Sequence, residues 1–515
     1  MDLQRASGIL LHPTSLPGPY GIGDLGPEAY RWVDFLLESR TQLWQILPLG
    51  PTGFGDSPYQ CFSAFAGNPY LVSFGQLEET GLWDSEMAAE MPDFPSDRVD
   101  FGTLIPWKLE ALEGVFNRFK AGTYEELNAG LERFKLEQKE WLGDFALFMA
   151  LKEDHSGAPW WEWELPLRVR DPEVIARVRT DKSEAVERHE FYQFLFFDQW
   201  NRLKEYASSR GIKLIGDLPI FVALDSADVW SNPRLFYLDE DGNPTVVAGV
   251  PPDYFSPTGQ LWGNPLYRWE AHAEDGYRWW VARLQAVLAM VDIIRLDHFR
   301  GFAAAWHVPA GEETAVRGAW VDGPGDEFFQ KIKEELGDLP LIAEDLGVIT
   351  PDVTAIREKY ALPGMKVMVF AFDSGPVSQF LPHNHRLDHV VYTGTHDNDT
   401  TLGWYLRIEE KERSFFHQYL RYAGDEPNWE MIRAAWASVG VFALAPAQDF
   451  LGLDNRARMN YPSKPSGNWQ WRMLPQAFNG ATAKRIAYLN QLYDRDTWLR
   501  EGGEANGSEE GVEAA

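Results

Sequence analysis

Four acidic side chains each follow a short apolar run and precede a turn: Asp217, Asp297, Glu344 and Asp397. If those runs are parallel strands of one barrel, their carboxyl ends share a face, and the four acids surround one pocket. Several acids around a pocket suit cleavage of a glycosidic bond, which needs one carboxylate that stays ionised and one carboxyl group that keeps its proton. The sequence therefore indicates chemistry at an acetal carbon, provided that the fold brings these strand ends together.

Arg295 and Asp297 lie two residues apart in the run Val291–Phe302, so both side chains point to the same face of a strand. A buried structural ion pair is one interpretation, and a catalytic carboxylate at the carboxyl end of a barrel strand is the other. In the second case the guanidinium of Arg295 keeps Asp297 ionised. Glu344 stands among other carboxylates, and we expect their repulsion to raise its pKa so that it keeps its proton near neutral pH.

Short apolar runs alternate with helical patterns along most of the chain, which is typical of parallel βα units. Eight of these runs fit the strands of a (β/α)8 TIM barrel, a fold of the α/β class. The intervals after the second and third runs far exceed the roughly 30 residues of a βα unit, which predicts large insertions in the βα loops on the C-terminal face. The predicted strands are Gly8–Leu11, Leu43–Leu47, Lys213–Gly216, Ile293–Leu296, Leu341–Ala343, Lys366–Phe370, Val390–Thr393 and Val441–Ala445.

The insertions divide the chain into barrel segments and two added subdomains. Apolar residues at three- and four-residue spacing predict helices over 107–120, 124–150 and 188–208 of the first insertion. The tail is rich in Gly and Glu, and we expect it to be disordered. The predicted domains are residues 1–71 with strands one and two, 72–210 as a mainly helical insertion, 211–220 with strand three, 221–283 as a second insertion, 284–500 with strands four to eight, and 501–515 as an acidic tail.

Two aromatic stretches in the insertions have competing interpretations. Residues 159–163 (PWWEW) form either a packing cluster between helices or a surface platform for a sugar ring. Residues 249–267 (GVPPDYFSPTGQLWGNPLY) combine Pro, which stiffens a loop, with Gly, which permits sharp turns. They form either a packed Ω-loop or an aromatic lid across the cleft, in which Tyr254, Phe255 and Trp262 contact the ligand.

The composition argues against several classes of partner. The formal net charge of −30 disfavours nucleic acid and anionic membrane surfaces, both of which attract basic proteins. No run approaches the ~18 apolar residues of a transmembrane helix. Cys61 is the single cysteine, which rules out an intrachain disulfide and is consistent with a reducing cytoplasm, the predicted location. No metal-ligand spacing, phosphate loop or dinucleotide fingerprint is found, and we expect no metal and no cofactor.

Seven short stretches of the sequence resemble a known enzyme family. Three of them are similar to signature regions of the α-amylase clan, namely Arg295–His298, Glu344–Gly347 and His396–Asn398. The other four resemble the amylomaltases, the 4-α-glucanotransferases that are called disproportionating enzymes in plants. These four are residues 8–17, 57–60, 216–222 and 468–469, and the similarity extends from about residue 5 to about residue 500.

The resemblance implies a role for each acid of its three central motifs. Asp297 resembles the nucleophile that forms a covalent glucosyl-enzyme, Glu344 the general acid/base, and Asp397 the third acid, which stabilises the transition state. His298 either helps to position a glucan or forms a structural turn, and Asn468 either contacts substrate or closes the barrel by packing. The predicted substrate contacts are Tyr59, Asp217, Arg295, His298, His396, Tyr254, Phe255, Trp262 and Asn468.

The activity implied by the resemblance is transfer of α-1,4-glucan segments, including maltooligosaccharides, to glucose or another glucan with retention, and formation of large cyclic glucans. An α-1,4-glucan hydrolase of the same clan is the alternative, since it would share all the acids. Leu218-Pro219 stands where hydrolytic amylases carry Asn-His, which disfavours the hydrolase. A catalytically silent glucan-binding scaffold would lack one of the three acids. We expect a monomer or weak homo-oligomer without nucleic-acid or membrane partners.

Overall fold

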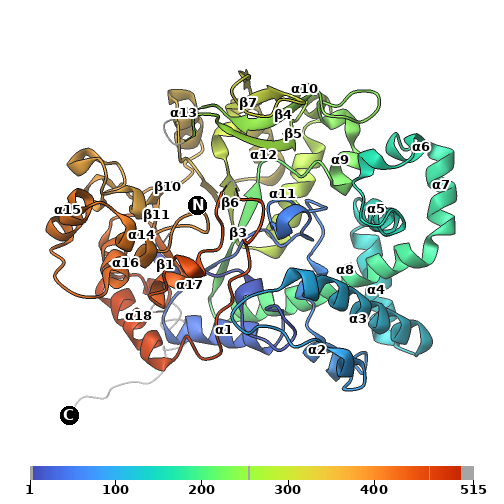
Figure 1. Cartoon of the computed structure of the whole chain (residues 1–515), viewed down its shortest axis with the longest axis horizontal. Helices are drawn as coiled ribbons and strands as arrows, with labels where there is room; N and C mark the ends of the chain where they lie inside the picture. The colour runs from blue at the N-terminus through green and yellow to red at the C-terminus, as the bar shows by residue number, and fades with distance from the viewer. Residues whose placement is uncertain (1–3, 253–255, 463, 500–515) are drawn as a thin grey trace, which may run out of the picture.

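The computed structural model of the chain describes residues 4–252, 256–462 and 464–499 (Figure 1). Tyr254 and Phe255, two of the predicted substrate contacts, and the predicted tail at 501–515 lie outside the described residues. A barrel of strands occupies the middle of the molecule, and the helices that follow β2 in the chain lie on the right in Figure 1.

Eight parallel strands close into a barrel in the order β1-β12-β11-β10-β9-β6-β3-β2. Each overlaps a run that the sequence predicts as a strand, so the TIM-barrel prediction is confirmed. Most predicted boundaries differ from the observed ones by one to three residues. The strand expected at Lys366–Phe370, for example, ends at Val367, because Met368–Phe370 turns into a 3-10 helix at the barrel mouth. The barrel strands are β1 (Ala6–Leu10), β2 (Leu43–Gln45), β3 (Lys213–Pro219), β6 (Ile293–Asp297), β9 (Leu341–Ala343), β10 (Gly364–Val367), β11 (His389–Tyr392) and β12 (Phe442–Pro446).

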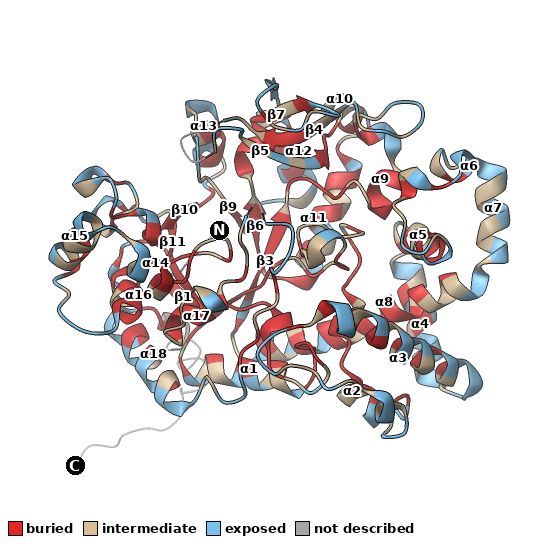
Figure 2. Ribbon diagram, in the orientation of Figure 1, coloured by how far each residue is buried: buried red, intermediate tan, exposed pale blue. Residues whose placement is uncertain are grey.

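The barrel strands are buried, while the surrounding helices expose their outer faces (Figure 2). Helix α1 (Pro27–Glu38) shows how the sequence produces this arrangement. It begins at Pro27, whose fixed φ suits the first helical position. Its buried residues recur at three- and four-residue spacing and therefore form one apolar stripe. Trp32 of this stripe packs edge-on against Trp44 of β2, with 6.4 Å between ring centroids, so that the stripe faces the barrel.

Helices fill the chain between β2 and β3. The single helix expected over 124–150 is two helices, because Trp141 at the break turns inward and packs on Phe65 and Phe197. The apolar spacing typical of a helix continues in the sequence through Trp141, but the tertiary packing of this large ring ends the first helix. These helices are α2 (Phe74–Glu79), α3 (Phe101–Ala121), α4 (Glu125–Glu137), α5 (Leu142–Asp154), α6 (Leu165–Arg168), α7 (Pro172–Asp181) and α8 (Ser183–Ser209).

The aromatic stretch at 159–163 is a packing cluster. Trp160 and Trp163 are 1% and 3% exposed. Their indole N–H groups donate to the main-chain oxygens of Leu224 and Ala158, at 2.7 and 3.1 Å. Buried Trp side chains normally find such partners for the one polar atom of the indole. These two rings therefore cannot serve as a surface platform for a sugar.

A four-stranded antiparallel sheet in the order β5-β4-β7-β8 lies beside the barrel mouth, at the top of Figure 1. Residues 249–267 are expected as a loop or lid, but Gly249–Val250 and Gln260–Pro265 belong to this sheet, in which Val250 pairs with Gln260. A turn at 256–259, with a hydrogen bond from Gly259 N–H to the Ser256 carbonyl oxygen, leads into Gln260. Gly259 in that turn has a φ of 67°, and a Cβ there would lie 2.3 Å from the Val250 carbonyl oxygen. The strands are β4 (Val246–Val250), β5 (Gln260–Pro265), β7 (Ala304–Pro309) and β8 (Ala319–Asp322).

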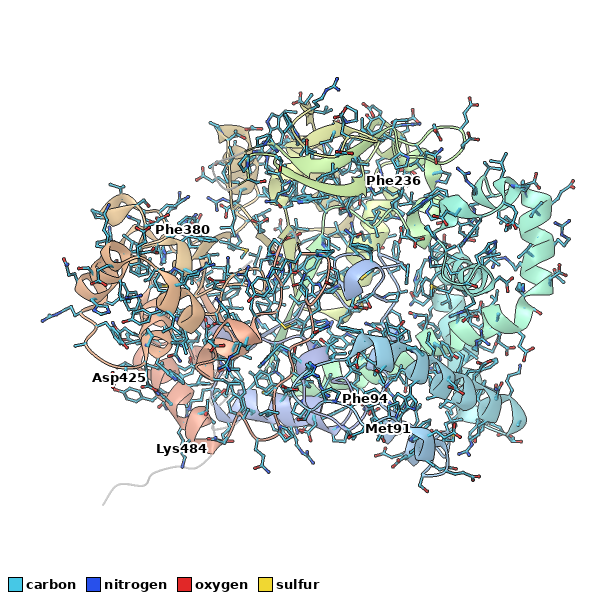
Figure 3. The ribbon with its side chains drawn as sticks, in the orientation of Figure 1. Met91, Phe94, Phe236, Phe380, Asp425 and Lys484 are labelled. Atoms are coloured by element: carbon cyan, nitrogen blue, oxygen red, sulfur yellow. The ribbon has the colours of Figure 1, made fainter. Side chains whose placement is uncertain are left out.

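This sheet joins two insertions, only one of which the sequence predicts. Strands β4 and β5 follow barrel strand β3, whereas β7 and β8 follow barrel strand β6. β4 pairs with β7, so the two loops form one unit. Phe236, labelled in Figure 3, has no exposed surface and packs on Tyr267, with 5.3 Å between ring centroids. The sequence analysis predicts no insertion after β6. The segments of β7 and β8 are short and only partly apolar, so they give no clear strand pattern.

The remaining helices follow the barrel strands or the sheet. Within the described part of the chain, no helix has the length and apolar character needed to cross a membrane. These helices are α9 (Ala227–Ser231), α10 (Trp269–Glu274), α11 (Arg278–Met290), α12 (Gly325–Leu336), α13 (Pro351–Lys359), α14 (Thr401–Arg407), α15 (Glu410–Leu420), α16 (Pro427–Ala437), α17 (Ala447–Phe450) and α18 (Gly480–Leu492).

Candidate active site

Arg295 links the acids at the carboxyl ends of the barrel strands. Because β3 and β6 are hydrogen-bonded neighbours, Asp217 lies beside Arg295 in register. Nη1 of Arg295 lies 2.7 Å from Oδ2 of Asp217 and 2.9 Å from Oδ1 of Asp297. The expected Arg295–Asp297 pair is present, and Asp217 is a second partner that the sequence analysis did not anticipate. Asp297 is therefore both a partner in a buried ion pair and available for chemistry, because 28% of its side chain stays exposed.

Glu344 follows β9, and main-chain N–H groups hold both of its carboxyl oxygens. His298 N–H donates to Oε2 at 2.8 Å, and Leu346 N–H donates to Oε1 at 2.9 Å. Burial raises the pKa of Glu344 to about 8, Asp297 adds to the rise, and Arg295 opposes it. The expected direction is confirmed, and repulsion from Asp297 contributes as expected, but burial is the larger cause. Glu344 thus keeps its proton at neutral pH.

Asp397 follows β11 and has the opposite electrostatic environment. Burial alone would raise its pKa, but His396 and Asn460 more than offset this and lower the pKa to about 2. Nε2 of His396 lies 3.3 Å from Oδ2, and Nδ2 of Asn460 donates to Oδ1 at 2.7 Å. For His396 burial has the opposite effect and lowers the pKa, but the neighbouring Asp397 outweighs burial and raises the pKa of His396. Asp397 is therefore an anion at neutral pH.

Tyr59 connects these acids to an aromatic wall. Its hydroxyl group donates to Oδ2 of Asp217 at 2.8 Å. Its ring stacks on His396, with 5.0 Å between centroids and 15° between planes, and tilts against Trp469 at 5.8 Å. A flat, partly exposed Tyr ring beside carboxylates can bind the apolar face of a sugar ring while the acids bind its hydroxyl groups.

Asn468 supports this wall through the hydrogen bonds of its side-chain amide. Its amide oxygen accepts a hydrogen bond from Tyr461 N–H, and its amide nitrogen donates to the Lys464 carbonyl oxygen, both at 2.9 Å. Trp469 then adopts a φ of 64°, which is rare for a side chain of its size. The bonds of Asn468 support the packing alternative, in which it shapes the turn that presents Trp469 to Tyr59.

His298 and Trp262 form a second pair of rings, next to Asp297. His298 has a left-handed backbone, with φ 49° and ψ 50°, which turns the chain sharply after Asp297. Its ring meets that of Trp262 edge-on, with 4.7 Å between centroids. Burial lowers the pKa of His298 to about 4, so the ring is neutral. Since Trp262 belongs to β5, the sheet of the inserted subdomain reaches the residue next to Asp297.

Asn460 and Trp469 are the site residues that the sequence analysis missed. Both lie in the irregular segment after β12, far in sequence from the acids that they contact. No spacing rule links Asn460 to Asp397. For Trp469 a signal existed, because residues 468–469 formed one of the stretches that carried the family resemblance.

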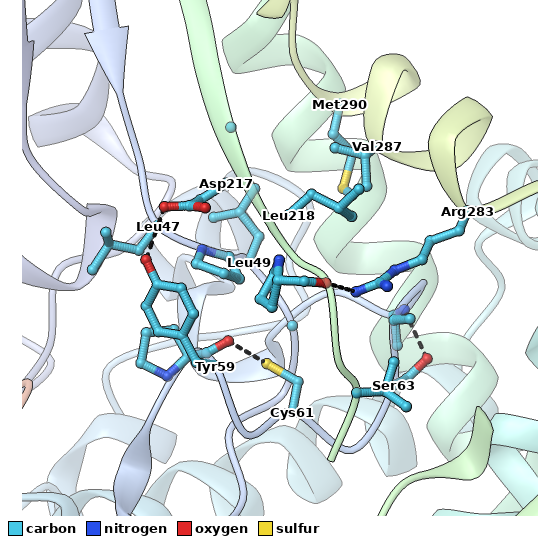
Figure 4. A pocket seen from close by; sticks show the side chains of 18 of the residues that line it. Leu47, Leu49, Tyr59, Cys61, Ser63, Asp217, Leu218, Arg283, Val287 and Met290 are labelled. Carbon is cyan, nitrogen blue, oxygen red and sulfur yellow. Dashed lines mark hydrogen bonds between the residues drawn. The ribbon is translucent and has the colours of Figure 1, made fainter. Parts of the chain in front are cut away.

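A cavity of about 70 Å³ lies behind Tyr59 and Asp217 (Figure 4). Its lining is mainly apolar and includes Leu218 and Met290. Cys61 also lines it, and its thiol donates to the Pro58 carbonyl oxygen at 2.9 Å. Burial raises the pKa of this thiol to about 12, so it stays protonated and is a poor nucleophile at neutral pH. Among the described residues, no group of three His, Cys, Asp or Glu side chains could hold a metal ion.

The site combines a protonated carboxyl group, a permanent anion and a carboxylate paired with a buried guanidinium. Arg295 interacts electrostatically with Glu344, Asp397 and Asp297, so these groups share one environment. Two acids whose environments drive their pKa values apart are suited to acid-assisted displacement at an acetal carbon.

Comparison with known proteins identifies a family for this arrangement. A family model described as 4-alpha-glucanotransferase matches residues 11–477. A 4-alpha-glucanotransferase of Thermus thermophilus is 51% identical over 503 residues, covering 96% of this chain and 100% of the relative. One of Synechocystis sp. is 48% identical over 500 residues, covering 96% and 98%. The solved structure of an amylomaltase from Streptococcus agalactiae in complex with acarbose aligns with a TM-score of 0.93 at 40% identity, covering 96% of this chain and 100% of that one.

Proposed function

This chain belongs to the 4-alpha-glucanotransferase family, and we propose that it transfers α-1,4-glucan segments to the 4-hydroxyl group of glucose or another glucan. Asp297 acts as the nucleophile, Glu344 as the general acid/base, and Asp397 stabilises positive charge at the anomeric carbon. Two displacements give net retention of configuration. The opposite pKa shifts of Glu344 and Asp397 carry the proposal, because one site then holds both a proton donor and a permanent anion.

In the first displacement, the proton of Glu344 passes to the glycosidic oxygen as the bond from that oxygen to the anomeric carbon breaks. A carboxylate oxygen of Asp297 forms a bond to the same carbon, and the reducing-end fragment leaves. Arg295 pairs with Asp297 at 2.9 Å and orients it for this attack. The ionised Asp397 stabilises the positive charge that develops on the sugar ring.

In the second displacement, the ionised Glu344 takes the proton of an incoming 4-hydroxyl group, whose oxygen displaces Asp297. The aromatic rings of Tyr59 and Trp262 favour a sugar over water as the acceptor, because they offer large apolar faces next to the acids. When the acceptor is the far end of the bound chain, the product is a large cyclic glucan.

Maltotriose as the sole substrate tests the proposal. We expect glucose together with a ladder of maltooligosaccharides longer than maltotriose, because each glycosyl-enzyme is intercepted by another sugar. Chromatography of the products over time measures this. Glucose and maltose without any longer product would instead identify an α-1,4-glucan hydrolase, in which water is the acceptor.

The pH dependence of transfer follows from Glu344. The first displacement needs the protonated form, so kcat/KM for maltotriose should fall about tenfold per pH unit above about pH 8. Asp397, with a pKa of about 2, stays ionised throughout. Initial rates measured across pH show this fall in kcat/KM. The matched control is α-maltosyl fluoride as the glycosyl donor, because departure of fluoride needs no proton. A maltotriose profile that stays flat well above pH 8 would contradict the assignment of Glu344.

A further inference from the structure

The loop that carries Glu344 is attached to the segment after β6 at three points. His298 N–H donates to Oε2 of Glu344 at 2.8 Å, and Phe299 N–H donates to its main-chain oxygen at 3.2 Å. Four residues beyond Glu344, the carbonyl oxygen of Val348 accepts a hydrogen bond from Nη1 of Arg300. Three consecutive residues that follow Asp297 thus hold the loop of the acid at both of its ends.

Arg300 is buried in an unusual environment for a cation. It is 7% exposed, and its Nε is buried without a hydrogen-bond partner among the described residues. The guanidinium carbon lies 3.9 Å from the centroid of the Trp320 ring. A cation over the face of a Trp ring is attracted by the negative face of that ring. The Val348 carbonyl group and this ring contact the Arg300 head group directly, and the carboxylate of Asp352 attracts it electrostatically.

Trp320 reaches Arg300 from the inserted sheet. It belongs to β8 and pairs in register with Trp306 of β7, with 5.4 Å between the two rings. Trp320 is partly open to solvent, with 42% of the residue exposed. The inserted sheet therefore contacts this region through two strands: β5 carries Trp262, and β8 carries Trp320, which packs on Arg300.

We propose that Arg300, held by Trp320, is a positioning residue that keeps the acid Glu344 in register with the nucleophile Asp297. The inference rests on the roles given above to these two carboxyl groups. Without the Arg300 bond, the Val348 end of the loop loses this anchor. The contacts of Asp345 with Met365 N–H and Arg357 remain. The carboxyl group of Glu344 can then shift away from the His298 N–H. Asp297 is anchored separately by Arg295, so its attack does not depend on Arg300.

Two glycosyl donors distinguish proton transfer by Glu344 from attack by Asp297 in the Arg300→Met variant. With maltotriose, the glycosidic oxygen must receive a proton from Glu344. With α-maltosyl fluoride, the carbon–fluorine bond breaks with its electron pair on fluoride while Asp297 bonds to the anomeric carbon, and no proton is needed. We expect maltotriose transfer to fall about 100-fold, whereas fluoride release in the first turnover changes less than about threefold. Arg300→Lys, which keeps the charge and one donor, should restore part of the maltotriose rate.

Trp320→Leu is the second variant, since its exposed position makes it tolerable to the fold. We expect the same donor-selective loss, about three- to tenfold, with an unchanged melting temperature. Arg317→Met is the matched control, because the side chain of Arg317 is 79% exposed in the same inserted segment. Equal losses with both donors, or no loss with maltotriose, would overturn the inference, and Trp320→Leu decides it if Arg300→Met does not fold. Wild-type protein that gives no lengthened products would instead overturn the proposed function.

Discussion

Replacing Asp297 with Asn is expected to abolish glucan transfer while leaving the fold intact. Loss of a catalytic nucleophile lowers kcat by on the order of 10⁴- to 10⁶-fold, and the amide cannot form the glycosyl-enzyme. The buried guanidinium of Arg295 keeps its 2.7 Å pair with Asp217, so no buried cation is left without a partner. The melting temperature should therefore stay within a few degrees of that of the wild-type protein. Initial rates with maltotriose and a thermal unfolding curve measure both expectations.

The same variant should also fail to release fluoride from α-maltosyl fluoride, because the nucleophile is needed whichever group leaves. This outcome distinguishes a nucleophile from an acid. Asp322→Asn, an identical substitution at an exposed position of β8, serves as the control and should retain full activity. A ladder of products from the Asp297→Asn variant at the wild-type rate would disprove the assignment of the nucleophile.

The fold could be predicted from the sequence wherever local patterns decide it. The barrel strands are short, mainly apolar runs that end in charge or turn residues, and this pattern identifies Ile293–Leu296 without any knowledge of its neighbours. Two features escaped prediction because they depend on tertiary contacts. Trp141 divides a helix by packing on a distant ring, and β7 becomes a strand because β4, more than 50 residues earlier, supplies its partner.

The candidate site shows the same division. Acids at strand ends share a face by topology alone, so Asp217 and Asp297 could be placed together once the runs were recognised as neighbouring strands. Asn460, Trp469 and Arg300 act through irregular segments, whose course no residue spacing fixes. The larger cause of the high pKa of Glu344 was also out of reach, because burial depends on the whole fold.

Replacing Glu344 with Ala is expected to separate the two displacements. Maltotriose transfer should fall by about 10²- to 10⁴-fold, the usual contribution of a general acid and base. With α-maltosyl fluoride the first displacement continues, and the protein should gain the mass of one maltosyl group because no base activates the acceptor. Azide needs no base, so it should restore turnover and give α-maltosyl azide, since two inversions give retention. Mass spectrometry and fluoride release measure these outcomes.

Ala is a better choice than Gln at this position. Both oxygens of Glu344 accept main-chain N–H groups, from His298 and Leu346, so the amide nitrogen of Gln would face one of these donors. A buried donor left without an acceptor costs about 1–3 kcal/mol, which would mix a structural loss with a chemical one. In the Ala variant, the space vacated by the carboxyl group admits water, which can accept from both N–H groups. Glu335→Ala on α12, with a half-exposed side chain, is the matched control. If fluoride release in Glu344→Ala falls as far as maltotriose transfer, Glu344 positions the substrate or the nucleophile and is not the proton donor.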